Sequence, residues 1–533
     1  MRAALGLGLL VSLAYTLVVP LYPAINNPNE NVRLYMSAAL AERGAYEITP
    51  YRHRWGWTND AACVEVAADG SRSACVGPGR GAEREYFSVK APGLSLAGAL
   101  PYAALLEQPG RDALPRVAWL LRLCCVILPM LIFLAFYLRV LRREDAPAGM
   151  AEVVFLAVAL GSPFLGYSLL FVSHAPSAAA AFGAFALLDA RRRRGESLGV
   201  GRAAAAGLLA AGASFFEYPA FFASLALSLL AIRFYRRGEL VAFLLGAAVP
   251  TALTMHFQAR AFGSPFLPGH RFVESDFLRA RHEQGFFGAE GFSLQTAGEL
   301  LVHPRIGLFA LTPLLALGVA GYALRLRDRA HRPTAATALF ILAASFLSVC
   351  TLNNYDGGWS IGARYLVLLL PFLGHGSLIA LRTVSARAPT LASTLMVAAG
   401  LAGVVASTAP SLIYPHVPPE LDRPLRQLFL PLMSEGRWPP TLGAWFGASG
   451  AFAVLGILAA AAVATLAFAL RSAPRPRRWI ALTLGPLLAC LWLTPQLLGG
   501  RADDDPEVLR AGELIRDTFT SSLPARARDA PSR

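Results

Sequence analysis

The sequence predicts an all-α, polytopic membrane protein with a bundle of about thirteen transmembrane helices. Its composition is the first observation: of 533 residues, 55% are apolar and only 15% are charged, and the mean hydropathy is +0.49. The second observation is a series of long apolar runs that approach the roughly 20 residues a helix needs to cross a bilayer. The third is the position of the arginines, which cluster between those runs.

The net charge of +14 does not indicate a nucleic-acid-binding protein. The arginines form short clusters at the ends of apolar runs, as in Arg139–Arg143, Arg191–Arg194 and Arg325–Arg329, and this is the pattern of the positive-inside rule. Residues 94–106 are apolar but too short to span, so we expect them to lie as a helix in the membrane interface. With this assignment, all the clusters between spans fall on one side of the membrane.

The chain is expected to begin with an uncleaved transmembrane helix at residues 1–23, because no small-residue cleavage site follows the first apolar run. An outer loop, 24–114, carries the polar motifs described below. A transmembrane core, 115–385, includes an outer loop at 258–304. C-terminal helices, 386–499, include an outer loop at 410–447, and an outer-face tail, 500–533, is expected to be partly disordered. The thirteen expected spans are residues 1–23, 116–138, 150–171, 175–189, 201–216, 219–235, 239–257, 305–324, 334–351, 364–381, 389–408, 449–470 and 479–498.

This topology places the N-terminus in the cytoplasm and the polar loops on the periplasmic or extracellular face. The Ala- and Arg-rich composition points to a GC-rich bacterium, so we expect a multi-pass protein of the bacterial inner membrane. Cys63 and Cys75 flank a polar segment of the first outer loop, where an oxidising compartment would allow a disulfide.

Two motifs of the first outer loop dominate the sequence: Asn26–Asn31 and Tyr86–Gly93. Lys90 is the only lysine in the chain. An ammonium is a compact point charge that suits a phosphate group, so we expect Lys90 to contact phosphate and to face the carboxylate of Glu30. The alternative is a lone lysine that extends toward water at the membrane interface.

The outer face collects further candidate groups, several of them at the ends of spans, where ionisable residues often mark a site. Asp60 is a second candidate, beside Glu30, for the catalytic carboxylate. The candidates for contacting phosphate or substrate are Arg260, Arg305, Arg364, His174, Glu217, Tyr218, Asp356 and Trp359.

A carboxylate with lysine and arginine suits one chemistry: it can deprotonate an acceptor while the cations stabilise a phosphate leaving group. No Gly-rich phosphate loop, Ser-His-Asp signature or zinc-binding helix motif occurs. The histidines are scattered rather than at ligand spacing. The sequence therefore predicts no metal-ligating residues and no specific cofactor, and it leaves a divalent metal ion open.

The order of these motifs resembles that of the C-type (GT-C) glycosyltransferase superfamily, in particular the protein O-mannosyltransferases and the aminoarabinose transferase of lipid A. Asn29-Glu30 is similar to the acidic motif that follows the first span in these enzymes, and Lys90–Leu94 is similar to the element before the second span. The resemblance covers roughly residues 1–385 and continues in later segments: Phe216–Pro219, Phe262–Pro265, Arg305–Phe309 and Gly357–Tyr365.

The resemblance implies a GT-C-like bundle, Glu30 as the catalytic base, Lys90 as a ligand of the donor phosphate and Arg364 as a second contact. Two departures leave the base open between Glu30 and Asp60. The family often has two adjacent acids where this chain has Asn29-Glu30, and it often has another acid where this chain has Ser173-His174.

We therefore predict an integral membrane glycosyltransferase. By the resemblance, it would transfer a sugar with inversion from a polyprenyl-phosphate donor to a lipid, glycan or protein acceptor at the outer face. Its expected partners are these substrates and membrane lipids, with no nucleic acid. One alternative is a transporter of lipid-linked saccharides, although the span interiors are nearly free of charge. A second is a non-catalytic relative.

Overall fold

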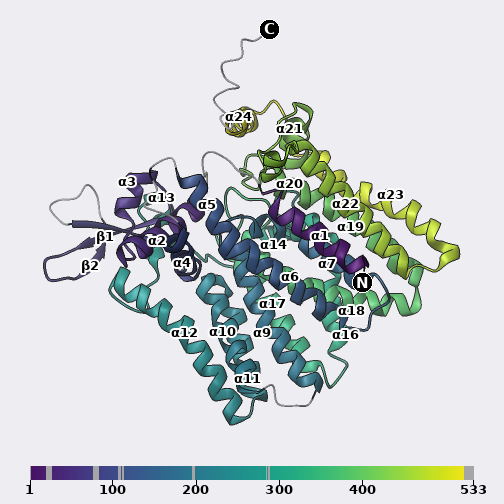
Figure 1. The fold of residues 1–533 in the computed structure, drawn as a ribbon, viewed down its shortest axis with the longest axis horizontal. Helices are drawn as coiled ribbons and strands as arrows, with labels where there is room; N and C mark the ends of the chain where they lie inside the picture. Colours follow the sequence, from purple (N-terminus) through teal and green to yellow (C-terminus); the bar gives the residue numbers. More distant parts are fainter. Residues whose placement is uncertain are drawn as a thin grey trace, which may run out of the picture.

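The computed structural model describes residues 2–19, 27–75, 83–105, 110, 113–194, 199–283, 285 and 288–520. The chain is largely helical (Figure 1). Among the described residues, seven helical segments are long and apolar enough to cross a membrane: Leu114–Arg142, Arg237–Phe262, Arg332–Cys350, Arg364–Arg387, Pro389–Ile413, Gly450–Ser472 and Arg475–Leu497.

The other expected spans are shorter or less apolar helices, so the predicted count of thirteen is confirmed only in part. They are α1 (Arg2–Thr16), α7 (Met150–Ala159), α9 (His174–Arg194), α10 (Val200–Phe216), α11 (Phe221–Phe234) and α16 (Gly318–Arg325). The predicted span at 150–171 is not one helix. It breaks after Ala159 and resumes as α8 (Phe164–Ser168), because Pro163 cannot donate the hydrogen bond of a helix interior.

Several of the long segments combine shorter elements. Leu114–Arg142 consists of α5 (Leu114–Arg122), a π-helical turn (Leu123–Ile127) and α6 (Leu128–Arg142). The remaining long helices are α12 (Arg237–Phe262), α17 (Arg332–Cys350), α18 (Leu370–Arg387), α19 (Pro389–Gly403), α20 (Ala409–Ile413), α22 (Gly450–Ser472) and α23 (Arg478–Leu497). Four shorter helices lie in the connections between these helices: α13 (Asp276–Glu283), α14 (Leu294–Val302), α15 (Leu308–Leu311) and α21 (Leu430–Ser434).

Small residues bring the helices close together. A Cβ at Gly246 of α12 would lie 2.0 Å from the carbonyl oxygen of Ala204 in α10. A Cβ at Gly321 of α16 would lie 1.8 Å from the carbonyl oxygen of Gly376 in α18. Contact between backbones is typical of helix packing in membranes, where apolar side chains gain little by leaving lipid.

The first long loop, between α1 and α5, contains α2 (Pro28–Arg43), α3 (Thr49–Trp55), β1 (Ala61–Val66), β2 (Arg72–Ala74), β3 (Glu83–Ser88) and α4 (Gly93–Leu105). The helix α4 corresponds to the short helix predicted at 94–106. The three strands form an antiparallel sheet in the order β2-β1-β3, so the expectation of an all-α protein was wrong for this loop. The strand β1 reads Ala-Ala-Cys-Val-Glu-Val, and a disulfide joins its Cys63 to Cys75 just after β2.

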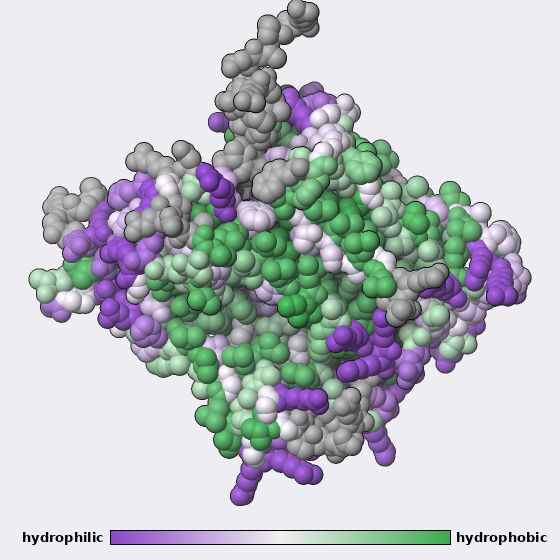
Figure 2. All heavy atoms as spheres, in the orientation of Figure 1, coloured by the Kyte–Doolittle hydropathy of each residue, from purple (hydrophilic) through white to green (hydrophobic). Residues whose placement is uncertain are grey.

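Contacts between loops define two ends of the bundle. At the sheet end, Ala62 pairs with Val273, Ala289 pairs with Leu352, and the amide of Ser360 donates to the carbonyl of Val417. At the arginine end, buried Glu144 contacts Arg325 at 2.7 Å and His375 at 2.9 Å. Figure 2 shows apolar side chains over the helical body and polar side chains over the sheet.

The tail packs onto the sheet end. The helix α24 (Pro506–Thr520) buries Val508, Ala511 and Ile515, and its Arg516 pairs with Glu435 after α21. Leu514 of this helix is 53% exposed. The expected disorder falls on residues 521–533, which lie outside the described residues. The described part of the tail therefore packs against the sheet end of the bundle.

The disulfide predicts the result of thiol labelling. The chain has six cysteines, of which Cys124, Cys125, Cys350 and Cys490 are free. We expect mass spectrometry of the denatured protein to count four alkylated cysteines without reductant and six after reduction. A Cys63→Ser/Cys75→Ser variant should show four under both conditions and should be cleaved faster within the sheet. Six labels on the unreduced wild-type protein would contradict the pairing.

Candidate functional site

The register of β1 and β3 brings an acid next to the only lysine of the chain. Ala61 pairs with Ser88, and the amide of Val89 donates to the carbonyl oxygen of Asp60. The pairing of the two strands therefore places Asp60 beside Lys90. The Lys90 Nζ lies 3.1 Å from the Asp60 carboxylate. The sequence predicted an acid facing Lys90, but we had expected Glu30, and the structure places Asp60 there.

The carboxyl group of Asp60 is held in its charged form. Burial raises its pKa, but the charges of Lys90, Arg364 and His270 and the hydrogen bond from Lys90 together outweigh burial, so its pKa lies below its usual range. Asp60 is therefore a carboxylate, able to accept a proton but not to donate one, across the neutral pH range.

Arg364 is the central cation of the site. It follows a tight loop in which Gly357, at φ +74°, packs against its side chain; a Cβ at Gly357 would lie 2.9 Å from the Arg364 Cγ. One Nη of Arg364 donates to the Tyr365 hydroxyl at 3.0 Å, while its buried Nε has no hydrogen-bond partner among the described residues. Within the residues that the structure describes, no carboxylate lies within 4.0 Å of Arg364, so the guanidinium charge is available to an anion.

Asp60 and Arg364 line the same cavity of about 650 Å³ at the sheet end. Asn and Trp side chains dominate its polar wall, and Leu514 of α24 closes one side. The lining residues are Asn27, Pro28, Asn29, Asn31, Trp57, Thr58, Asn59, Asp60, Leu278, Arg281, Asn354, Gly357, Gly358, Trp359, Arg364 and Leu514.

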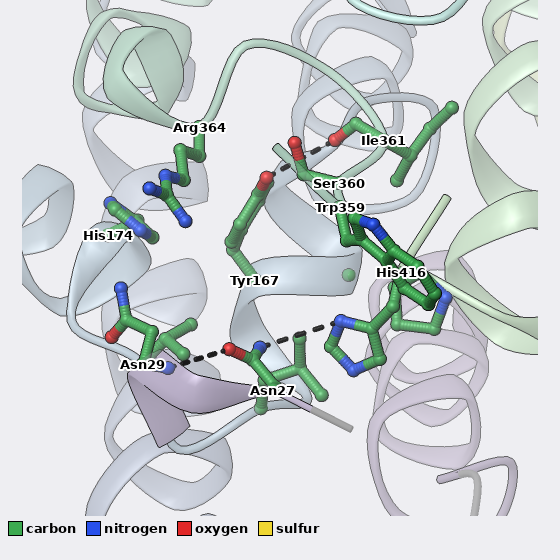
Figure 3. A pocket seen from close by; sticks show the side chains of 13 residues that line it. Asn27, Asn29, Tyr167, His174, Trp359, Ser360, Ile361, Arg364 and His416 are labelled. Carbon is green, nitrogen blue, oxygen red and sulfur yellow. Dashed lines mark hydrogen bonds between the residues drawn. The ribbon is translucent and has the colours of Figure 1, made fainter. Parts of the chain in front are cut away.

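Arg364 also lines two narrow recesses beneath this cavity. In the first, Asn27, Asn29, Tyr167, Trp359 and His416 surround the space, and Figure 3 shows Arg364 and His174 on one side and Trp359 and His416 on the other. The second is lined by His174, Ser177, Glu217, Pro219, Ala220, Arg364, Tyr365 and Leu368. The guanidinium thus lies between the open cavity and the interior of the bundle.

Glu217 reaches the second recess from the end of α10. Its carboxylate is 2.7 Å from an Nη of Arg33 and 3.7 Å from the Nδ1 of His174. Arg33 is fully buried in α2, and it also donates to Asn29 and to the carbonyl oxygen of Ala91, both at 2.9 Å. Arg33 therefore connects the Lys90 loop to α10.

Glu30 lies deeper than the cavity. Its side chain is 0% exposed, and its two oxygens accept from Arg122 Nε at 2.6 Å and Nη2 at 2.7 Å. The backbone amide of Phe171 also donates to it at 2.7 Å. Glu30 ties α2 to the Leu114–Arg142 helix and to the segment before α9.

The remaining candidates separate into two groups. Trp359 lines the cavity, whereas Arg305 and Asp356 form an ion pair of 2.9 Å that secures the loop between them. Arg305 also donates to the carbonyl of Gly358, at 2.8 Å. The other two do not line these pockets: Arg260 is exposed at the end of α12, and the ring of Tyr218 lies beside His270.

The sequence analysis did not select Trp57, Arg33 and His416, and it gave no binding role to Asn27 and Asn29 of the Asn26–Asn31 motif. The Asn27-Pro28 pair was a readable signal, because an Asn before a proline is typical of a helix start, and Asn27 caps α2 by accepting from the amides of Asn29 and Glu30. Nothing local marks the other positions. Among the described residues, no cluster of three or more His, Cys, Asp or Glu side chains could hold a metal ion.

An apolar groove of about 780 Å³ approaches the second recess from the side of the helical body. It runs between α4, α6, α9 and α10. Pro176 and Phe216 line it, and they are close in the chain to His174 and Glu217 of the recess. The groove and the recess therefore share the first turn of α9 and the last turn of α10.

Comparison with models of protein families gives no match, and comparison with curated proteins also gives none. Solved structures are similar at low identity. The oligosaccharyltransferase of Archaeoglobus fulgidus in its apo form is 14% identical, with a TM-score of 0.46 over 78% of this chain and 56% of that one. Another structure of the archaeal enzyme, AglB, holds an inhibitory peptide and a dolichol-phosphate.

ArnT from Cupriavidus metallidurans, bound to undecaprenyl phosphate, is 15% identical, with a TM-score of 0.43 over 96% of this chain and 88% of that one. The arabinosyltransferase EmbB of Mycobacterium smegmatis is 13% identical, with a TM-score of 0.43 over 98% of this chain and 41% of that one. The chain spans little more than half the length of the archaeal enzyme and less than half that of EmbB.

The Glu30–Arg122 pair predicts a large loss of stability when one partner is removed. Arg122→Leu leaves the Glu30 carboxylate buried without its cation, which typically costs about 3–5 kcal/mol. The control is Arg142→Leu, since the Arg142 side chain is 41% exposed in its pair with Glu152, and exposed pairs contribute about 0–1 kcal/mol. Thermal unfolding of the purified proteins in detergent measures both. Equal melting temperatures for the two variants would contradict a structural role for Glu30.

Proposed function

We propose that this chain is a membrane glycosyltransferase that moves a sugar from a polyprenyl-phosphate donor to an acceptor in the 650 Å³ cavity. The observation that carries the proposal is the arrangement around Arg364. Arg364, which has no carboxylate within 4.0 Å among the described residues, lies with Asp60 at the point where a polar cavity adjoins the interior of the bundle, and Asp60 is paired with Lys90. The motif order that resembles GT-C enzymes supports the same reaction.

The cations supply the site for phosphate. Arg364 offers a buried Nε that lacks a partner among the described residues, and a planar guanidinium suits phosphate oxygens. Lys90 adds a second positive charge beside Asp60. A phosphate at this position would gain two charge-assisted contacts as negative charge builds on the leaving group.

The apolar groove supplies the site for the lipid. Its walls are almost entirely apolar, including Leu100, Ile132 and Phe136, and it opens toward the surface of the helical body. A polyprenyl chain has the same apolar chemistry as these walls, so it could pass from the surrounding lipid into the groove and be held there by van der Waals packing. The phosphate end would then lie near Arg364, where the groove approaches Glu217 and His174.

In the proposed reaction, a hydroxyl oxygen of the acceptor bonds to the anomeric carbon of the donor sugar. The bond from that carbon to the phosphate oxygen breaks, and polyprenyl phosphate leaves with the electron pair. The hydroxyl proton passes to the Asp60 carboxylate. Attack from the face opposite the phosphate inverts the anomeric carbon, as the resemblance implies.

We assign the base to Asp60 rather than to Glu30. Asp60 lines the cavity, whereas both oxygens of Glu30 are engaged by Arg122 and the side chain is fully buried. The cavity faces the sheet end, opposite the arginine-rich connections. By the positive-inside rule, we propose that this end faces the periplasm or exterior of a bacterial inner membrane.

Transfer of radiolabelled sugar from polyprenyl-phosphate donors in membranes tests the proposal. We expect Asp60→Asn to lower transfer at least 100-fold, as for loss of a general base, and Arg364→Ala to lower it by a similar factor. Asp69→Asn is the matched control, because Asp69 is an exposed turn residue of the same loop. Glu30→Gln should retain transfer per folded molecule.

Two outcomes of this assay would contradict the proposal. Loss of transfer in folded Glu30→Gln, with activity retained in Asp60→Asn, would move the base to Glu30. Lipid binding without transfer by the wild-type protein, for every donor supplied, would favour a transporter or a non-catalytic relative.

The Asp60–Lys90 pair also predicts a pH effect. Lys90→Met removes the charge that lowers the Asp60 pKa while burial remains, so that pKa should rise. The acidic limb of the transfer profile should move to higher pH in Lys90→Met and stay near the wild-type position in Lys90→Arg.

Thermal unfolding gives a second readout of the pair that needs no activity. Since the folded pKa of Asp60 is depressed, the stabilisation should be present above about pH 4, the ordinary Asp value, and should fade as the pH falls through the folded pKa. An identical pH dependence of the melting temperature in wild type and Lys90→Met would contradict the electrostatic coupling.

A further inference from the structure

Two tryptophans present open ring surface in the cavity. Trp57 is 65% exposed and Trp359 is 39% exposed, and both line the cavity. The indole N–H of Trp57 donates to Glu274 at 3.2 Å, and Arg52 holds the same carboxylate at 2.7 Å. The polar atom of Trp57 is thus engaged by protein, which fixes the ring and leaves its face toward the cavity.

The backbone on both sides of the second tryptophan, Trp359, is held by hydrogen bonds. The flanking Gly358 carbonyl accepts from Arg305, and the amide of Ser360 donates to Val417. Figure 3 shows the Trp359 indole beside His416 at the wall of the first recess. An aromatic side chain has only two side-chain torsions, so it loses little conformational entropy when a ligand stacks on it.

The surface between the rings is neutral and rich in amides. Asn27, Asn29, Asn31, Asn59 and Asn354 line the cavity, and an amide group both donates and accepts hydrogen bonds. The charged residues among the described lining are Asp60, Arg281 and Arg364. Arg364 and Asp60 belong to the proposed reaction centre, and half of the other lining residues are asparagines and tryptophans.

We propose that the acceptor is a saccharide whose ring stacks on Trp57 or Trp359 while its hydroxyls bond the surrounding asparagines. A sugar ring has an apolar face of C–H groups and an edge of hydroxyls that each donate and accept, which matches this wall in both respects. The volume of about 650 Å³ lies within the usual range of small-molecule sites, about 300–1,000 Å³. This inference rests on the proposed transferase function, and it places one acceptor hydroxyl at Asp60.

Binding without any donor tests the acceptor separately from the reaction. Purified protein is titrated with neutral trisaccharides built from glucose, mannose, N-acetylglucosamine or arabinose, and with a Ser/Thr-containing peptide, while tryptophan fluorescence is recorded. We expect saturable binding of at least one trisaccharide, at least tenfold weaker in Trp57→Ala or Trp359→Ala, with partial recovery in Trp57→Tyr. Asn59→Ala should also weaken binding, by several-fold.

Trp479→Ala is the matched control, because Trp479 is 64% exposed but lies at the start of α23, at the arginine end. It should bind as the wild type does, and the melting temperatures of all variants establish that they are folded. The inference is overturned by the absence of binding for every saccharide, by binding that the cavity variants do not change, or by a preference for the peptide. Saccharide binding without transfer would instead uphold this inference and reject the proposed reaction.

Discussion

Two buried charges on α2, one helical turn apart, hold the sheet end of the bundle together. Glu30 binds Arg122 and the amide of Phe171, and Arg33 binds Glu217 and the carbonyl of Ala91. A charge taken out of water is costly unless it is paired and hydrogen-bonded, so each partner must stay within reach of the other. The helix α2 is thereby fixed between the Leu114–Arg142 helix on one side and α10 on the other.

This arrangement explains how a polar site can form beside a membrane bundle. The N-cap of α2 places Asn27 and Asn29 at the cavity wall, and Arg33 holds the loop that carries Lys90. The sheet then supplies Asp60 through its register with β3. Each polar group of the site is therefore positioned by an element that is secured elsewhere, which favours a preorganised site.

Arg364 divides the site into two chemically different halves. Toward the sheet end lies a cavity of amides and tryptophans, and toward the helical body lies an apolar groove that ends at Phe216 and Pro176. A donor with a lipid tail and an acceptor with hydroxyls need these two environments. In the proposed reaction, the guanidinium lies at the point where the phosphate of one would meet the sugar of the other.

The sequence by itself determined the membrane class and the short helix near residues 94–106, because hydropathy and arginine clusters are local properties. It did not determine the sheet, which depends on pairing between residues that are distant in the chain, such as Ala61 and Ser88. Nor could it choose among acids. From the sequence alone, Glu30 and Asp60 are both plausible catalytic carboxylates. Only the tertiary structure shows that Glu30 is paired with Arg122, whereas Asp60 contacts Lys90 and lines the cavity. A carboxylate's role depends on its neighbours and on its access to water, and folding alone decides both.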